Sequence, residues 1–123
     1  MGDLSRNFSS KEFACKCCCG QVNLSPRLID GLQRLRDLAG EPIRITSGYR
    51  CPAHNTAVGG VPDSQHTKGQ AADISIGRKT TAEIKALAEQ IDVFADGGIG
   101  GYPDHGFVHV DVRGHKARWG RFE

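Results

Sequence analysis

Two histidines and two aspartates in this sequence are spaced so that they could surround one metal ion. His66 precedes Asp73 in DSQHTKGQAADIS, and His109 and Asp111 stand together in GFVHVDV. Side chains alternate across a strand, so His109 and Asp111 share one face while the neighbouring valines face the core. If Asp73 lies on an adjacent strand, it converges with His109, and the loop before Asp73 brings His66 over both.

These residue types favour a zinc site. Two imidazoles and one carboxylate suit Zn²⁺, and three protein ligands leave a fourth position for water. Bound zinc lowers the pKa of that water toward ~7 and polarises a carbonyl group, which is the chemistry of amide hydrolysis. The residues alone also fit a metal-free pair in which His109 and Asp111 form a hydrogen bond at the surface, so both interpretations stay open on spacing.

Two amphipathic segments are expected to form the helices that support these strands. In LSPRLIDGLQRLRDLAGEP, Ser25 and Pro26 suit a helix start and Gly40 its end. In TTAEIKALAEQI, Thr80 and Glu83 have the spacing of a capping box, in which each side chain accepts a hydrogen bond from the other residue's backbone. The segment between the caps in each case repeats apolar residues at helical spacing.

Short strands are expected at 43–46, 71–76, around Ile99 and at 107–112, with a turn at 103–106 joining the last two. A long loop rich in glycine and proline separates the first two. Helices and strands do not alternate strictly, which predicts a single α+β domain over residues 1–123 with a small antiparallel sheet and flanking helices.

Composition excludes several classes of protein. The 123 residues are 38% hydrophobic and 24% charged, with a net charge of +2. This charge is too small to indicate nucleic-acid binding, and no apolar run approaches the ~18 residues of a membrane span. We expect a monomer without membrane insertion. The start, MGDLSRNFSS, lacks the pattern of a secretory signal, which predicts another export route or a domain of a longer exported protein.

The five cysteines are an odd number, so they cannot all pair within one chain. They are Cys15, Cys17, Cys18, Cys19 and Cys51. A disulfide to Cys51, free thiols and a second metal site all remain open, although adjacent cysteines are poorly placed to close on one ion.

Three segments together resemble the zinc D-Ala-D-Ala carboxypeptidase family of murein peptidases, peptidase family M15, which includes phage endolysins. They are SGYRCPAHN, VGGVPDSQHTKGQAADI and GFVHVDV, in the family's order over about residues 43–113. The resemblance implies the α+β fold of the Hedgehog and DD-peptidase group. It also implies one catalytic Zn²⁺ held by His66, Asp73 and His109, and the peptidoglycan stem peptide as substrate.

The resemblance extends to residues around the metal. Arg50, from SGYR, resembles the family arginine that contacts the substrate or the developing oxyanion, tasks that suit a planar guanidinium. Asp111 is expected to orient a ligand histidine. Ser64 and Gln65 are candidate substrate contacts beside the zinc.

The sequence departs from the family pattern at the general base. Well-characterised members carry Glu or Asp three residues before the last zinc histidine, where this chain has Gly106. Asp104 and His105 are the nearby ionisable candidates, if the turn YPDHG folds over the site. Both residues also suit ordinary turn chemistry.

The leading hypothesis is therefore a zinc metallopeptidase that cleaves an amide bond in the murein stem, as a D-Ala-D-Ala carboxypeptidase or a related endopeptidase. Such an enzyme without a visible signal fits a phage or prophage lysis or tail protein. One alternative is a catalytically silent, zinc-containing wall-binding or structural module, favoured by Gly106. Another is a thiol-based metal or redox module built on the cysteines.

Overall fold

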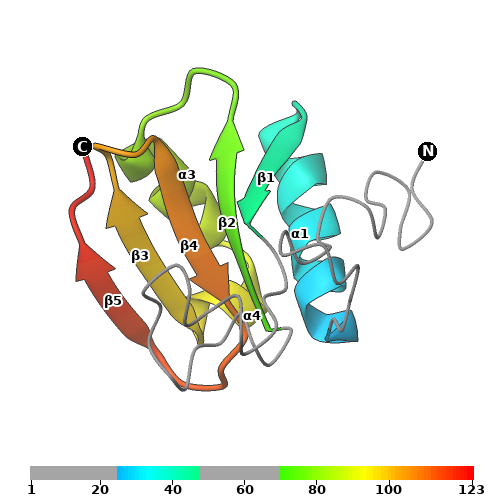
Figure 1. Cartoon of the computed structure of the whole chain (residues 1–123). Coiled ribbons are helices and arrows are strands. Elements are labelled where there is room, and N and C mark those ends of the chain that lie inside the picture. Colours follow the sequence, from blue (N-terminus) through cyan, green and yellow to red (C-terminus); the bar gives the residue numbers. More distant parts are fainter. Residues whose placement is uncertain (1–24, 48–69) are drawn as a thin grey trace, which may run out of the picture.

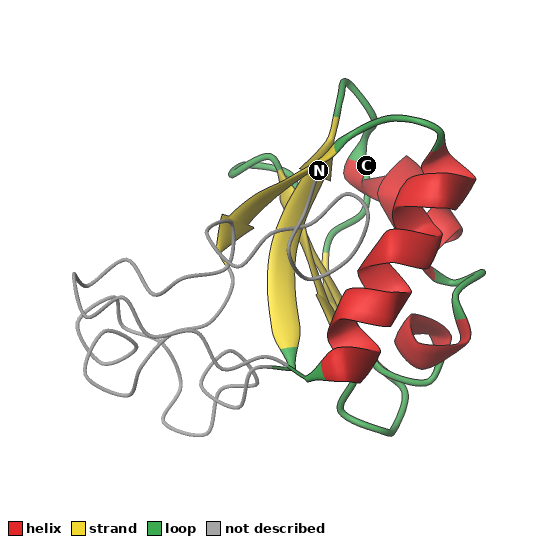
Figure 2. Cartoon of the chain, turned by 90° about the vertical axis from the view of Figure 1, so that its right-hand side faces the viewer, coloured by secondary structure: helices red, strands yellow, loops and turns green. Residues whose placement is uncertain are grey.

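The computed structural model describes residues 25–47 and 70–123, which form two layers. The helices all lie against one face of a five-stranded sheet (Figures 1 and 2). The elements are α1 (Pro26–Ala39), β1 (Ile43–Ser47), β2 (Ala71–Ile76), α3 (Thr81–Ala88), α4 (Asp92–Ala95), β3 (Gly98–Tyr102), β4 (Phe107–Asp111) and β5 (Ala117–Gly120). This is the α+β class that the sequence predicts.

The sheet is mixed, which corrects the prediction of an antiparallel sheet. Its strand order is β1-β2-β4-β3-β5, and every neighbouring pair is antiparallel except β3 and β5. The chain leaves β4 and crosses the end of β3 through residues 112–116 before it enters β5 (Figure 1). Because β5 is entered from that end of the sheet, it runs in the same direction as β3.

Local side-chain chemistry sets both helix starts and the end of α1 as predicted. The Ser25 side chain accepts a hydrogen bond from the Arg27 backbone N–H, and Gly40 ends α1 at φ 72°, a conformation that glycine adopts without strain. The capping box of Thr80 and Glu83 begins α3. This helix stops at Ala88, earlier than predicted, and Ile91 becomes the N-cap of α4.

One apolar core fills the space between helices and sheet. Alternate residues of β2 and β4, such as Ile74, Val108 and Val110, are fully buried against the helices. The helices contribute Leu28, Leu32, Leu35, Ile84 and Phe94 to the same cluster. The residues between these strand positions must point to the opposite side of the sheet. No helix among the described residues is long and apolar enough to cross a membrane.

Candidate functional site

The opposite face of the sheet, called the site face below, brings Asp73 and His109 together. The two residues are direct partners in the antiparallel pairing of β2 and β4. The Nδ1 atom of His109 lies 3.2 Å from Oδ1 of Asp73, and both side chains are largely buried. Alternation along two strands therefore produces the convergence expected from the sequence.

An irregularity in β1 lies beside Asp73. The register shifts between Ile45 and Ser47, where Ser47 becomes the partner of Asp73. The Thr46 hydroxyl donates a hydrogen bond to the Asp73 carbonyl oxygen over 3.1 Å. A β-bulge commonly re-aims side chains next to a functional site, and here it anchors the backbone that carries the carboxylate.

Asp111 binds the other nitrogen of the same imidazole. Its Oδ2 lies 2.7 Å from Nε2 of His109, and the side chain is fully buried. The Arg113 guanidinium donates to both carboxylate oxygens, with Nη2 2.7 Å from Oδ2 and Nε 3.0 Å from Oδ1. The Gly98 backbone N–H donates to Oδ1 over 2.8 Å. These donors fix the carboxylate in place beside the imidazole.

The pKa values of both groups are shifted toward their charged forms. Burial alone would raise the pKa of Asp111, but hydrogen bonds from His109 and Arg113 outweigh it and hold that pKa well below its usual range. Burial alone would lower the pKa of His109, yet hydrogen bonds and charges from Asp111 and Asp73 raise it above its ordinary value. Ionised Asp111 is therefore an acceptor, and Nε2 of His109 carries a proton toward it.

This donor set fits one half of a zinc site. With the proton on Nε2, the lone pair of neutral His109 is on Nδ1, which faces the Asp73 carboxylate. Two acceptors 3.2 Å apart need a cation or a proton between them. Two zinc bonds of about 2.0–2.1 Å at a tetrahedral angle would place their donor atoms about 3.3 Å apart. His109 and Asp73 are thus spaced as neighbouring zinc ligands.

The other sequence-predicted residues of this site lie outside the described residues. They are Arg50, Ser64, Gln65 and His66, together with the five cysteines. Within residues 25–47 and 70–123, no group of three or more His, Cys, Asp or Glu side chains could hold a metal ion. A third ligand for a metal held by Asp73 and His109 would have to come from outside the described residues, where the sequence predicts His66.

The chain also matches a known protein family. The peptidase M15 family model matches residues 6–111. This chain belongs to the peptidase M15 family. The match runs through β1, β2, β3 and β4, and it ends at Asp111.

Curated M15-like relatives share about a third of their aligned residues with this chain. Peptidoglycan L,D-endopeptidase MepK of Escherichia coli (strain K12) is 36% identical over 97 residues, which are 73% of this chain and 52% of the relative. Zinc D-Ala-D-Ala carboxypeptidase of Streptomyces albus G is 34% identical over 89 residues, which are 72% of this chain and 34% of the relative. The chain thus spans about half the length of MepK and about a third of the length of the carboxypeptidase.

The turn at 103–106 carries the two candidates for the general base, and both are exposed. The His105 ring stacks on Phe107, with centroids 6.1 Å apart, and Phe107 is two residues from His109 on the site face. Asp104 instead pairs with Arg121, with Oδ1 2.9 Å from Nη2. Gly106 has φ 74°, so an acidic residue at the family's usual position would be strained here.

Several residues of the site face were missed in the sequence. Arg113 holds Asp111, and Trp119 on β5 packs against His109 with ring centroids 5.0 Å apart. Gly98 and Gly100 on β3 leave the space that Asp111 and Trp119 fill. The sequence feature that could have revealed this packing is the pattern GGIGGY, because glycine in a strand commonly marks the close approach of another group. The strand β5 lies in the segment GHKARWGRF, where the sequence predicts no strand.

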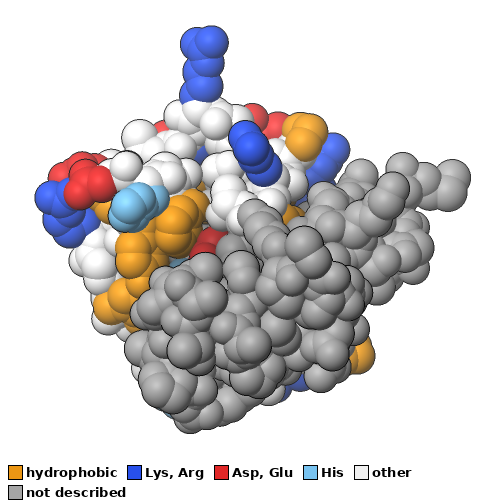
Figure 3. Space-filling model, in the orientation of Figure 1, with side chains coloured by type: hydrophobic (Ala, Val, Ile, Leu, Met, Phe, Trp, Pro, Cys, Tyr) orange, Lys and Arg blue, Asp and Glu red, His pale blue; other side chains and the backbone are white. Residues whose placement is uncertain are grey.

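The site face also carries apolar side chains beside a histidine, as the space-filling view shows (Figure 3). Tyr102 stacks on Phe107 with centroids 4.8 Å apart. The Tyr102 hydroxyl accepts a hydrogen bond from Trp119 Nε1 over 2.7 Å. These aromatic rings extend the site face from His109 toward the 103–106 turn.

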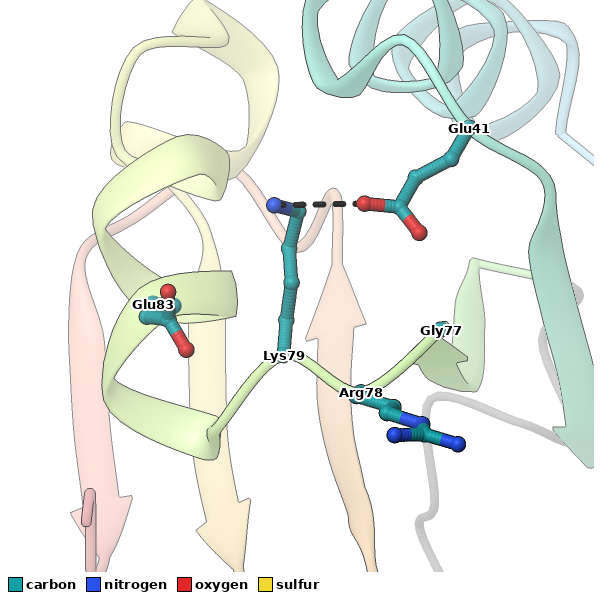
Figure 4. A pocket seen from close by; sticks show the side chains of 5 residues that line it. All are labelled: Glu41, Gly77, Arg78, Lys79 and Glu83. Atoms are coloured by element: carbon teal, nitrogen blue, oxygen red, sulfur yellow. Dashed lines mark ion pairs between the residues drawn. The ribbon is translucent and has the colours of Figure 1, made fainter.

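A depression of about 440 Å³ lies elsewhere, beside the start of α3 (Figure 4). Three of the four charged side chains that line it among the described residues make structural contacts: Lys79 pairs with Glu41 over 3.3 Å, and Glu83 accepts the Thr80 N–H of the capping box. None of the predicted site residues that the structure describes, such as Asp73 and His109, lines it. It is therefore separate from the candidate metal site.

Proposed function

We propose that this chain is a zinc-dependent peptidase that hydrolyses an amide bond in the peptide stem of peptidoglycan. The observation that carries the proposal is His109, placed between Asp73 on the metal side and the anchored carboxylate of Asp111 on the other. A histidine whose second nitrogen is bound by a carboxylate is the usual arrangement of a zinc ligand. The names of the relatives supply the substrate class and the metal.

His66, Asp73 and His109 would hold the ion. Bound zinc supplies a Lewis acid and lowers the pKa of a water molecule for attack on a carbonyl carbon. Arg50 grips the substrate carboxylate or stabilises the oxyanion, because its guanidinium can donate two parallel hydrogen bonds. His105 takes the proton of the attacking water, since Asp104 is held by Arg121.

Two positions of cleavage fit these residues, and the relatives' names divide between them. A carboxypeptidase removes a terminal D-Ala and needs a cation for the free carboxylate, whereas an L,D-endopeptidase cuts within the stem or cross-link. Arg50 serves either reaction. Incubation with defined muropeptides, followed by mass spectrometry of the products, identifies the bond that is cut.

The matched test compares His109→Ala with His115→Ala. We expect zinc-loaded wild-type protein and His115→Ala to release the same product, because His115 is an exposed residue between β4 and β5. We expect His109→Ala to release none and to bind less zinc. Wild-type protein that holds one zinc per chain and cleaves no stem peptide would contradict the peptidase proposal.

The second candidate function is a catalytically silent zinc-containing wall-binding or structural module. The specific observation in its favour is Gly106, which stands where well-characterised members have an acidic residue. Its backbone is in the left-handed region. Co-sedimentation with purified peptidoglycan, together with zinc binding and an absence of products, would support this function instead.

A further inference from the structure

Arg113 and Trp119 form a closed set of contacts with the candidate metal ligand. His109 bonds to Asp111, and Asp111 bonds to Arg113. The Arg113 guanidinium lies over the Trp119 ring, 5.0 Å from its centroid, and His109 packs against the same ring. The imidazole is therefore bounded by a hydrogen bond at Nε2 and by the indole ring, which is tilted 53° to it.

The strand register explains why the indole reaches the imidazole. Gly100 on β3 is the direct partner of both His109 on β4 and Trp119 on β5. A Cβ atom on Gly100 would lie 2.3 Å from the Trp119 ring, so only glycine leaves room for the ring to cross β3. The Trp119 N–H then bonds to the Tyr102 hydroxyl over 2.7 Å, which fixes the ring in this position.

Gly98 leaves room for the Asp111 carboxylate in the same way as Gly100 leaves room for the indole. A Cβ atom on Gly98 would lie 2.4 Å from Oδ2 of Asp111 and 2.9 Å from Nε of Arg113. The bidentate guanidinium fixes the plane of the carboxylate, which a lysine ammonium cannot do because it is a point charge. Held in this plane, the Asp111 carboxylate accepts a hydrogen bond from Nε2 of His109 and not from Nδ1.

We propose that Arg113 and Trp119 are positioning residues that hold His109 with its proton on Nε2 and its Nδ1 lone pair directed toward Asp73. Arg113 acts through Asp111, and Trp119 acts by blocking rotation of the imidazole. This proposal rests on the proposed function insofar as the ion at Nδ1 is zinc. The orientation of the ring, with Nε2 toward Asp111 and Nδ1 toward Asp73, is already present in the metal-free protein.

The first experiment measures zinc affinity by competition with a chromophoric chelator. Arg113→Lys keeps the charge and loses the bidentate geometry, and we expect it to weaken zinc binding by about 10- to 100-fold. Arg118→Lys is the matched control, because Arg118 bonds to Glu89 and to the carbonyl groups of Gly97 and Ala95, away from His109. We expect that control to lower the unfolding midpoint and to keep the zinc affinity. Equal losses of affinity in the two variants would overturn the role of Arg113.

The second experiment is a double-mutant cycle on the indole. Gly100→Ala displaces the Trp119 ring, so we expect Gly100→Ala and Trp119→Ala each to weaken zinc binding. Because both changes remove the same contact, the double variant should bind zinc about as well as Trp119→Ala alone. Losses that simply add would overturn the role of Trp119. Circular dichroism identifies variants that are folded, and Trp119→Phe replaces any variant that is not.

The third experiment needs neither zinc nor substrate. Long-range ¹H–¹⁵N correlation spectra of the metal-free protein report which nitrogen of neutral His109 carries the proton. We expect Nε2–H in wild type and in Arg118→Lys, and a mixture of tautomers in Arg113→Lys. Nδ1–H in wild type, or an unchanged tautomer in Arg113→Lys, would overturn the proposal. A protein with the expected tautomer that cleaves no stem peptide would contradict the proposed function alone.

Discussion

At the scale of single residues, the imidazole of His109 can donate or accept at either nitrogen, and its neighbours decide which. Asp111 is fully buried and held by an arginine and a backbone N–H, so it acts as a fixed acceptor. Asp73 faces the remaining nitrogen, where its negative charge would attract the cation of the proposed site. The two aspartates therefore have different roles although both contact the same ring.

Asp73→Asn tests whether the negative charge of the Asp73 carboxylate contributes to metal binding. The amide has nearly the same size but lacks the negative charge that attracts a divalent ion, so we expect zinc affinity to fall at least about 100-fold. Chelator competition measures this, and Asp30→Asn on the exposed side of α1 serves as the control. Zinc affinity equal to that of wild type would mean that Asp73 is not a ligand.

His105→Gln tests the proton acceptor. Loss of a general base typically lowers the rate about 10²- to 10⁴-fold, and we expect that loss in kcat on a muropeptide while zinc content stays at the wild-type level. Asp104→Asn should change kcat little, because Asp104 pairs with Arg121. A larger loss of kcat in Asp104→Asn than in His105→Gln would reverse the assignment.

Alternation along two strands predicted that Asp73 and His109 meet once the strands were assumed to be neighbours, because period two is a property of the backbone. It could not reveal Arg113 or Trp119. Their contacts depend on β5 lying beside β3 and on two glycines that leave space. Non-local pairing of this kind has no local pattern in the sequence.

At the scale of the elements, the helix starts were predictable because each is decided by residues within one turn. β5 was not predictable: ARWG is short, and its middle residues are polar and aromatic without a repeated apolar face. In the sequence, β4 lies between β5 and its partner β3, so the two paired strands are not consecutive. The same omission produced the incorrect expectation of an antiparallel sheet.

Arg118 connects β5 to α3 through Glu89, and this contact predicts a dependence of stability on pH. Burial would raise the pKa of Glu89, but hydrogen bonds from Lys85 and Arg118 outweigh it and lower that pKa below 4.5. A group with a lowered folded-state pKa contributes stability above its unfolded pKa, and this contribution is lost as the pH falls through the folded value.

Glu89→Gln should therefore be less stable than wild type at pH 7, by under about 1 kcal/mol because the carboxylate is partly exposed. The difference should vanish well below pH 4.5. Urea unfolding of both proteins at pH 7 and pH 3 measures it. A difference of the same size at both values would show that packing of the side chain, rather than its charge, is responsible.

At the scale of the whole molecule, the sheet separates stability from chemistry. The helices cover one face of the sheet (Figure 2). That face carries the apolar core, and the site face carries Asp73 and His109. The two sets alternate along the same strands, so each strand residue serves one function or the other. Neighbouring residues of β4 illustrate this, since Val108 is fully buried in the core and His109 faces Asp73.

This separation predicts that a core cavity weakens the fold without changing the metal site. Leu32→Ala removes a fully buried side chain of α1, and we expect the free energy of unfolding to fall by about 2–5 kcal/mol. Zinc affinity of the folded protein, measured by chelator competition well below the unfolding midpoint, should stay within about twofold of wild type, because the cavity and His109 lie on opposite faces of the sheet. A tenfold loss of affinity would instead show that core packing sets the distance between β2 and β4, and hence the spacing of Asp73 and His109.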